Sequence, residues 1–167
     1  MPSSRLLLIA EDDENDVFLL QHAFDAAKTE NPVRFVKDGQ EAIDYISKQC
    51  MQNEDTAPSL VMLDLKMPRK SGFDVLEWMR KQPVLQGLPV FMFTSSTRQE
   101  DIDRAYLNGA TGFLVKPPST SQRLKLVNFL KDWLACNELP SVTRFGVKAA
   151  RQKLEERSAN SSISPPL

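Results

Sequence analysis

Several short apolar runs of the sequence are each followed by a side chain suited to binding or transferring phosphate. These side chains are Glu11, Asp12, Asp13, Asp64, Thr94 and Lys116. Crowded acids repel one another unless a hard cation binds, and Mg²⁺ suits them because it takes oxygen ligands and bridges to phosphate oxygens. Beside such an ion, Asp64 is a candidate nucleophile, a role that carboxylates play in aspartyl-phosphate enzymes. Phosphoryl transfer depends mostly on positioning and charge neutralisation, which the Lys116 ammonium and the Thr94 hydroxyl would supply.

Each of these residues also has an ordinary structural explanation when it is considered alone. An acid after a strand often caps the following helix, a role for which Asp13 or Asn15 is suited. An aspartate at a strand end is more often a turn residue than a nucleophile, and a lysine before proline usually lies in a solvated loop. The joint placement of the acids, Thr94 and Lys116 after separate runs favours a functional site.

The elements that would position these side chains follow a regular alternation. Five apolar runs, each followed by a segment with apolar residues at helical spacing, cover residues 6–9, 33–36, 60–63, 90–93 and 112–115. Such runs are typical of strands buried on both faces, and the alternation predicts an α/β fold: a doubly wound, five-stranded parallel sheet with helices on both faces. The carboxyl ends of parallel strands meet at one edge, where such folds bind ligands. The sequence therefore predicts one shared pocket.

Composition narrows the class of protein. The chain has 167 residues, 41% hydrophobic and 26% charged, which fits one soluble globular domain. Its 21 basic and 22 acidic residues leave a net charge of −1, so we expect no attraction to nucleic acid or anionic lipid. No apolar run reaches the roughly 20 residues of a membrane span, and no signal peptide is evident. Two widely separated cysteines, Cys50 and Cys136, fit free thiols in a reducing, cytoplasmic compartment.

The pattern changes near the C-terminus, which divides the chain into a domain at 4–138 and an extension at 139–167. Pro140 ends the strand–helix alternation, residues 145–157 fit a short helix, and the serine- and proline-rich remainder is typical of a disordered tail. The extension is too short for a helix-turn-helix output domain. Because it mixes basic and acidic residues, we interpret it as an interaction or dimerisation segment.

Four segments give the chain its resemblance to a known family. They are residues 8–13 (Leu-Ile-Ala-Glu-Asp-Asp), 63–72 (Leu-Asp-Leu-Lys-Met-Pro-Arg-Lys-Ser-Gly), 93–95 (Phe-Thr-Ser) and 109–117 (Gly-Ala-Thr-Gly-Phe-Leu-Val-Lys-Pro). From about Arg5 to Leu134 the sequence resembles the response-regulator receiver family. Its Glu-Asp acidic pair most resembles the single-domain, phytochrome-associated subgroup. The resemblance implies a flavodoxin-like sheet with strand order 2-1-3-4-5.

The same resemblance implies a role for each site residue. Glu11, Asp12 and Asp64 would hold Mg²⁺ with the backbone carbonyl of Lys66. Asp64 would be the phosphoacceptor, Thr94 the switch hydroxyl, Lys116 the family's lysine and Phe113 the switch aromatic. The resemblance favours Asp12 over Asp13 as the metal ligand. It also implies a cis peptide bond between Lys116 and Pro117, since X-Pro bonds have only a small trans preference.

By resemblance, the chain would be a stand-alone response regulator of a two-component phosphorelay. Its expected partners are a histidine kinase of the phytochrome type, a downstream protein target and a second copy of the chain in a homodimer, but neither nucleic acid nor a membrane. Phosphorylation adds roughly −1.5 to −2 charge, which would draw Thr94 and Lys116 inward and let Phe113 move. Beyond its own phosphorylation and dephosphorylation, it would not be an enzyme.

Three other functions fit parts of the sequence. A pseudo-receiver would bind partners without phosphorylation, but the intact set of Asp12, Asp64, Thr94 and Lys116 argues against it. A phosphatase of the haloacid-dehalogenase type would need a second aspartate two residues after Asp64, where Lys66 stands. A DNA-binding regulator would need a basic recognition helix, and none is evident.

Overall fold

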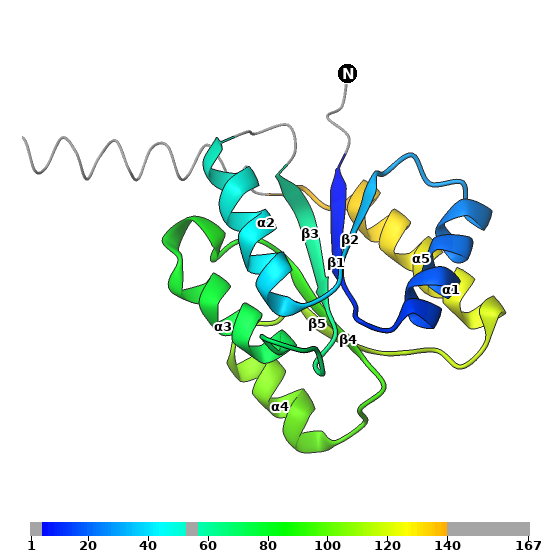
Figure 1. Ribbon diagram of the computed structural model, residues 1–167. Helices are drawn as coiled ribbons and strands as arrows, with labels where there is room; N and C mark the ends of the chain where they lie inside the picture. Colours follow the sequence, from blue (N-terminus) through cyan, green and yellow to red (C-terminus); the bar gives the residue numbers. More distant parts are fainter. Residues whose placement is uncertain (1–4, 53–56, 140–167) are drawn as a thin grey trace, which may run out of the picture.

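The computed structural model describes residues 5–52 and 57–139 and has the predicted alternation of strands and helices (Figure 1). Its elements are β1 (Leu6–Ala10), α1 (Glu14–Ala26), β2 (Val33–Val36), α2 (Gly39–Gln52), β3 (Pro58–Leu63), α3 (Gly72–Lys81), the 3-10 turn η2 (Pro83–Leu85), β4 (Val90–Thr94), α4 (Gln99–Leu107), β5 (Gly112–Val115) and α5 (Thr120–Cys136). All five predicted strands are present. Apart from residue 139, the predicted C-terminal extension, with its helix at 145–157, lies outside the described residues.

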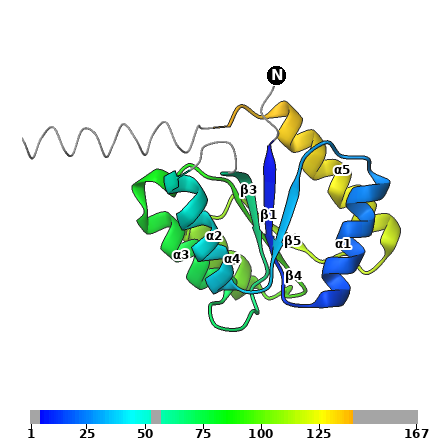
Figure 2. The same cartoon turned by 45° about the horizontal axis from the view of Figure 1, so that its top comes forward.

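The strands form one parallel sheet in the order β2-β1-β3-β4-β5, which confirms the expected flavodoxin-like topology. Helices α1 and α5 cover one face, and α2, α3 and α4 cover the other (Figures 1 and 2). Every residue of β1 and β4 is buried. Continuous apolar runs are needed there because helices exclude water from both faces of the central strands.

Side chains of the central strands alternate between two cores. In β1, Leu8 and Ala10 pack with α2, α3 and α4, whereas Leu7 and Ile9 pack with α1 and α5. This period of two is the geometry of an extended strand. It fixes which face each residue reaches, so the strand ends cannot shift by one residue without moving apolar side chains into the wrong core.

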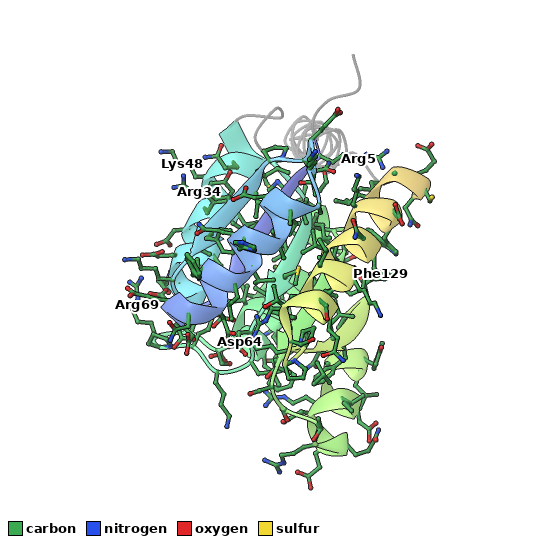
Figure 3. The ribbon with its side chains drawn as sticks, turned by 90° about the vertical axis from the view of Figure 1, so that its right-hand side faces the viewer. Arg5, Arg34, Lys48, Asp64, Arg69 and Phe129 are labelled. Atoms are coloured by element: carbon green, nitrogen blue, oxygen red, sulfur yellow. The ribbon has the colours of Figure 1, made fainter. Side chains whose placement is uncertain are left out.

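The predicted site residues lie at one end of the sheet. Figure 3 places Arg5, before β1, and Asp64, after β3, at opposite ends of the sheet. Because all strands are parallel, the residues that follow β1, β3, β4 and β5 lie at the Asp64 end. The sheet thereby gathers the predicted site residues from distant parts of the sequence.

The edge strand β5 departs from the prediction that all five strands are buried on both faces. Phe113 and Leu114 are half-buried, and Val115 is 45% exposed. The cause is the topology, since β5 pairs only with β4 and its other side has no strand neighbour. Among the described residues, no helix is long and apolar enough to cross a membrane.

Candidate functional site

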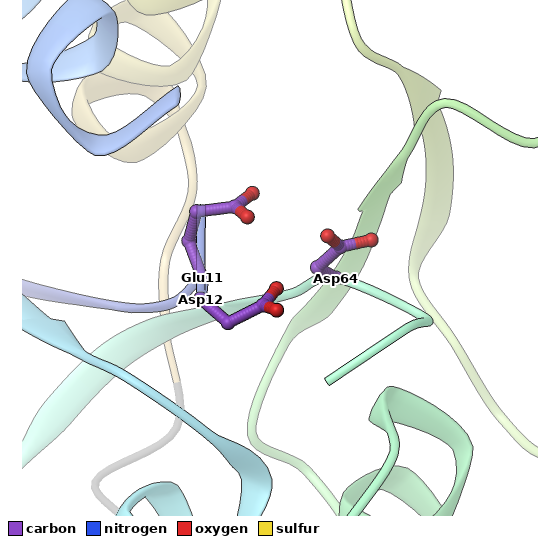
Figure 4. Close-up of side chains that lie close together, drawn as sticks. All are labelled: Glu11, Asp12 and Asp64. Carbon is purple, nitrogen blue, oxygen red and sulfur yellow. The ribbon is translucent and has the colours of Figure 1, made fainter. Parts of the chain in front are cut away.

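Three carboxylates meet where β1 and β3 end. The strands pair so that Ala10 lies opposite Leu63, and the Asp64 amide donates a hydrogen bond to the Ala10 carbonyl at 3.1 Å. This pairing brings Glu11, Asp12 and Asp64 together, with one oxygen of each within 4.8 Å of the others (Figure 4). Glu11 and Asp64 are buried and Asp12 is exposed, so the cluster opens to solvent on the Asp12 side.

The neighbouring Asp13 has a structural role as the N-cap of α1. Its carboxylate caps α1 by accepting hydrogen bonds from the amides of Asn15, at 2.8 Å, and Asp16, at 3.1 Å. Capping satisfies amides that have no partner within the helix. Asp12, rather than Asp13, therefore lies in the carboxylate cluster.

Lys116 brings a positive charge into this cluster from the end of β5. Its amide donates to the Thr94 carbonyl at 2.8 Å, which extends the pairing of β4 with β5. Its Nζ lies 2.7 Å from Glu11 Oε2, 2.8 Å from Asp16 Oδ2 and 2.9 Å from Asp64 Oδ2. The Lys116 side chain is only 10% exposed, so water screens these ion pairs weakly.

Burial and charge shift the protonation of this group. Burial raises the pKa of Glu11 to about 7, because removal from water penalises its charged form and the nearby Asp64 carboxylate adds repulsion. For Lys116, burial alone would lower the pKa, but hydrogen bonds to Asp16, Asp64 and Glu11 raise it above its ordinary value. The lysine therefore stays charged at neutral pH.

The donor set suits a divalent cation that prefers oxygen ligands. Glu11 Oε2 is buried, and the partner that the structure gives it is the Lys116 ammonium, at 2.7 Å. Glu11, Asp12 and Asp64 supply only carboxylate oxygens, which are ligands that Mg²⁺ and Mn²⁺ accept and that the softer metals favour less. The observed residues thus fit the expected Mg²⁺.

The other predicted residues lie at the end of β4, on β5 and in the loop after β3. Thr94 ends β4, is 2% exposed, and accepts a hydrogen bond from the Ser96 amide at 3.2 Å. Phe113 lies opposite Met92 in the sheet and packs against the core under α2, α3 and α4. Lys66 is exposed in the loop after β3.

The expected cis bond between Lys116 and Pro117 was wrong, because no peptide bond among the described residues is cis. The isomers of an X-Pro bond differ by only about 0.5–1 kcal/mol without tertiary contacts. Tertiary contacts around the bond therefore decide between the cis and trans isomers, and the Lys-Pro sequence alone does not specify the isomer.

The loop between β3 and α3 is held on two sides. Arg69, at φ 62°, donates through Nε to Asp38 Oδ2 at 2.8 Å, which ties the loop to the start of α2. At its far end, a Cβ added to Gly72 would lie 2.2 Å from the Asp64 carbonyl oxygen. Only glycine permits this close approach, so the start of α3 is packed directly against the backbone of Asp64.

Two charged residues that the sequence did not predict, Asp16 and Arg123, extend the site. Asp16, on α1, contacts Lys116 through one oxygen and Arg123 through the other, at 2.9 Å. Arg123 is buried on α5. A signal for Arg123 was present, since it stands four residues before the buried Val127 and seven before the buried Leu130. An arginine on the apolar face of a helix needs a buried partner.

Comparisons with known proteins agree with this geometry. A family model described as the response regulator receiver domain matches residues 7–128. The probable methanogenesis regulatory protein FilR2 of Methanothrix harundinacea is 30% identical over 136 residues, covering 81% of this chain and 87% of that protein.

Two solved structures share the fold over nearly their whole length. The Mn²⁺-bound form of Rcp1, a response regulator of Synechocystis, has a TM-score of 0.71 and 26% identity, covering 81% of this chain and 99% of that one. The phosphorylated cyanobacterial phytochrome response regulator RcpA has a TM-score of 0.73 and 28% identity, covering 81% and 98%. With the fold, the acidic cluster and the family match in agreement, this chain belongs to the response regulator receiver family.

Proposed function

We propose that this chain is a stand-alone response regulator that accepts a phosphoryl group from a histidine kinase onto Asp64. The observation that carries the proposal is the contact between Asp64 and Lys116, at 2.9 Å, inside a cluster of carboxylates. A carboxylate beside a fixed cation, at the open end of a parallel sheet, has the geometry of an acceptor for a charged group.

Mg²⁺ would be held by Glu11, Asp12, Asp64 and the backbone carbonyl of Lys66. When bound, it would supply the positive charge that neutralises the transferred phosphoryl group. The Mn²⁺-bound form of Rcp1 supports a divalent cation in a relative of this chain. The grouping of the Glu11, Asp12 and Asp64 carboxylates, with one oxygen of each within 4.8 Å of the others, supports the same assignment here.

The protein's own residues would carry out the transfer. A carboxylate oxygen of Asp64 forms a bond to phosphorus while the bond from phosphorus to the donor's imidazole nitrogen breaks, and the electron pair returns to that nitrogen. Lys116 already contacts Asp64, so its ammonium lies where it can donate to an oxygen of the incoming group. The exposed Asp12 side of the cluster is the route of approach.

The switch would follow from the added charge. In the structure the Thr94 hydroxyl oxygen accepts from the Ser96 amide, and we infer that it turns to donate to the phosphoryl group. Phe113, half-buried on the edge strand, then moves into the space that Thr94 leaves. The surface of α4, β5 and α5 changes, and a downstream protein that prefers one form responds.

We infer a histidine kinase of the phytochrome type as the phosphoryl donor, because RcpA is a phytochrome response regulator. Donor and acceptor would meet in the cytoplasm. A homodimer formed through the extension at 139–167 is a further proposal. The chain would not be an enzyme beyond its own phosphorylation and dephosphorylation.

The experiment labels purified protein with acetyl phosphate, with and without Mg²⁺, beside Asp64→Asn. We expect labelling of the wild type only with Mg²⁺ and none of the variant, which lacks the nucleophile. Asp13→Asn is the matched control, because it removes a neighbouring acid that lies outside the cluster. Undiminished labelling of Asp64→Asn would refute the assignment.

A further inference from the structure

One acid of the buried charge network lies outside the carboxylate cluster. Asp16 is on the first turn of α1, and the cluster is formed by Glu11, Asp12 and Asp64. Asp16 still reaches Lys116, with Oδ2 at 2.8 Å from Nζ. Its second oxygen, Oδ1, accepts from Arg123 Nη2 at 2.9 Å. Each oxygen of this carboxylate therefore has its own cation.

The Arg123 guanidinium has one hydrogen-bond partner among the described residues, the Asp16 carboxylate. The Arg123 side chain is 8% exposed, and its Nε and Nη1 are buried without a hydrogen-bond partner among the described residues. Leaving donors of a buried charge unpaired costs free energy. The position of this guanidinium thus depends on Asp16, which also joins α1 to the start of α5.

We propose that Asp16, itself held by Arg123, is a positioning residue for Lys116. It keeps the Lys116 ammonium close to Asp64 when phosphorylation or metal binding alters the other two carboxylates that Lys116 contacts, those of Asp64 and Glu11. This inference rests on the proposed function. Phosphorylation of Asp64 moves the negative charge from its carboxylate to the phosphoryl oxygens, and a divalent cation on Glu11 would compete with Lys116 for Glu11 Oε2. Asp16, outside the cluster, keeps its charged carboxylate in both events.

The main test compares two substitutions that change net charge equally on the same helical turn. Asp16→Asn removes the contact with Lys116, whereas Glu14→Gln removes an exposed acid and is the matched control. At saturating Mg²⁺ we expect Asp16→Asn to be labelled by acetyl phosphate about tenfold more slowly, since a displaced group costs rate steeply. Glu14→Gln should stay within about twofold of the wild type, because its charge change acts only through solvent.

Two readouts separate positioning from general damage. The Mg²⁺ concentration that gives half-maximal labelling should be unchanged within about twofold in Asp16→Asn, because Asp16 is not in the cluster that would hold the ion. Asp16→Glu, which restores a carboxylate, should recover most of the rate. Equal rates for Asp16→Asn and Glu14→Gln would overturn the inference. So would a rate loss in Asp16→Asn that disappears at saturating Mg²⁺ and appears only as a higher Mg²⁺ concentration for half-maximal labelling.

A metal-free measurement tests the contact itself. Thermal unfolding without Mg²⁺ is compared for Asp16→Asn, Lys116→Met and the double variant. We expect the loss of melting temperature in the double variant to be smaller than the sum of the two single losses, because the two residues interact directly. Additive losses would contradict the inference. If the wild type is not labelled at all, the proposed function fails; if it is labelled and Asp16→Asn behaves as Glu14→Gln, only the role of Asp16 fails.

Discussion

Lys116 is the residue on which the site depends for charge balance. It is the cation that ion-pairs with Glu11, Asp16 and Asp64 in the described part of the chain. Burial raises the pKa of Glu11, whereas the hydrogen bonds of Lys116 hold its own pKa above the ordinary value. In the resting arrangement a charged lysine therefore lies among three carboxylates, and a phosphoryl group on Asp64 would compete with them for its ammonium.

Removal of Lys116 should separate phosphorylation from switching. We expect Lys116→Ala to accept phosphate about 10²-fold more slowly, since one preorganised charge is lost while the carboxylate cluster remains. The phosphorylated variant should show no change in amide hydrogen exchange across α4 and β5, where the wild type changes. A variant that switches as the wild type does would refute the role of Lys116 in the switch.

At this scale the sequence predicted the identity of the clustered residues but not their full network. Glu11 and Asp12 follow β1, Asp64 follows β3 and Lys116 follows β5. The parallel topology alone brings these strand ends together. Asp16 and Arg123 lie on two helices, and their contact depends on how α1 packs against α5. No local pattern encodes that packing, although a buried arginine at helical spacing indicates that a partner is required.

Loops between elements set the position of the acceptor. The loop after β3 is tied to the start of α2 through Arg69 and Asp38, and Gly72 packs against the Asp64 backbone. Burial would raise the pKa of Asp38, but hydrogen bonds from the Glu41 amide and Arg69 hold it below its ordinary value of 3.8. Asp38 thus links the β2–α2 loop to the acceptor loop.

The Asp38 link should contribute stability only while its carboxylate is charged. A depressed folded-state pKa stabilises the protein above pH 3.8, and that contribution is lost as the pH falls through the folded-state value. Asp38→Asn should therefore lower the free energy of unfolding by about 1 kcal/mol at pH 7, with a gap that narrows in acid.

Urea denaturation at neutral and acidic pH measures this gap. Asp44→Asn is the control, since Asp44 is exposed on α2 and its described hydrogen bond is to the Gln40 side chain. A gap that widens as the pH falls would contradict the assignment.

The sequence predicted which strands and helices are present more reliably than how deeply each of them is buried. The apolar run 112–115 predicted a strand, and β5 is there, yet Val115 is 45% exposed. Hydrophobicity reports what a strand can bury, whereas the number of strand neighbours depends on the order of the sheet. Only the whole topology shows that β5 lies at an edge.

For the whole molecule, every described site residue lies between Glu11 and Arg123, within one sheet and its helices. Deletion of residues 140–167 should therefore leave the rate of labelling at Asp64 within about twofold of the full chain. We also expect the deletion to convert a dimer to a monomer in size-exclusion chromatography with light scattering. An unchanged mass would discard the extension as the dimerisation segment.

The central claim is that Asp64 forms an acyl phosphate. Borohydride reduces an aspartyl phosphate to homoserine, so peptide mapping by mass spectrometry after reduction identifies the residue that carried the phosphoryl group. We predict homoserine at position 64 in protein treated with acetyl phosphate and Mg²⁺, and none when Mg²⁺ is left out. Homoserine at Asp12 or another acid, with Asp64 intact, would contradict the account.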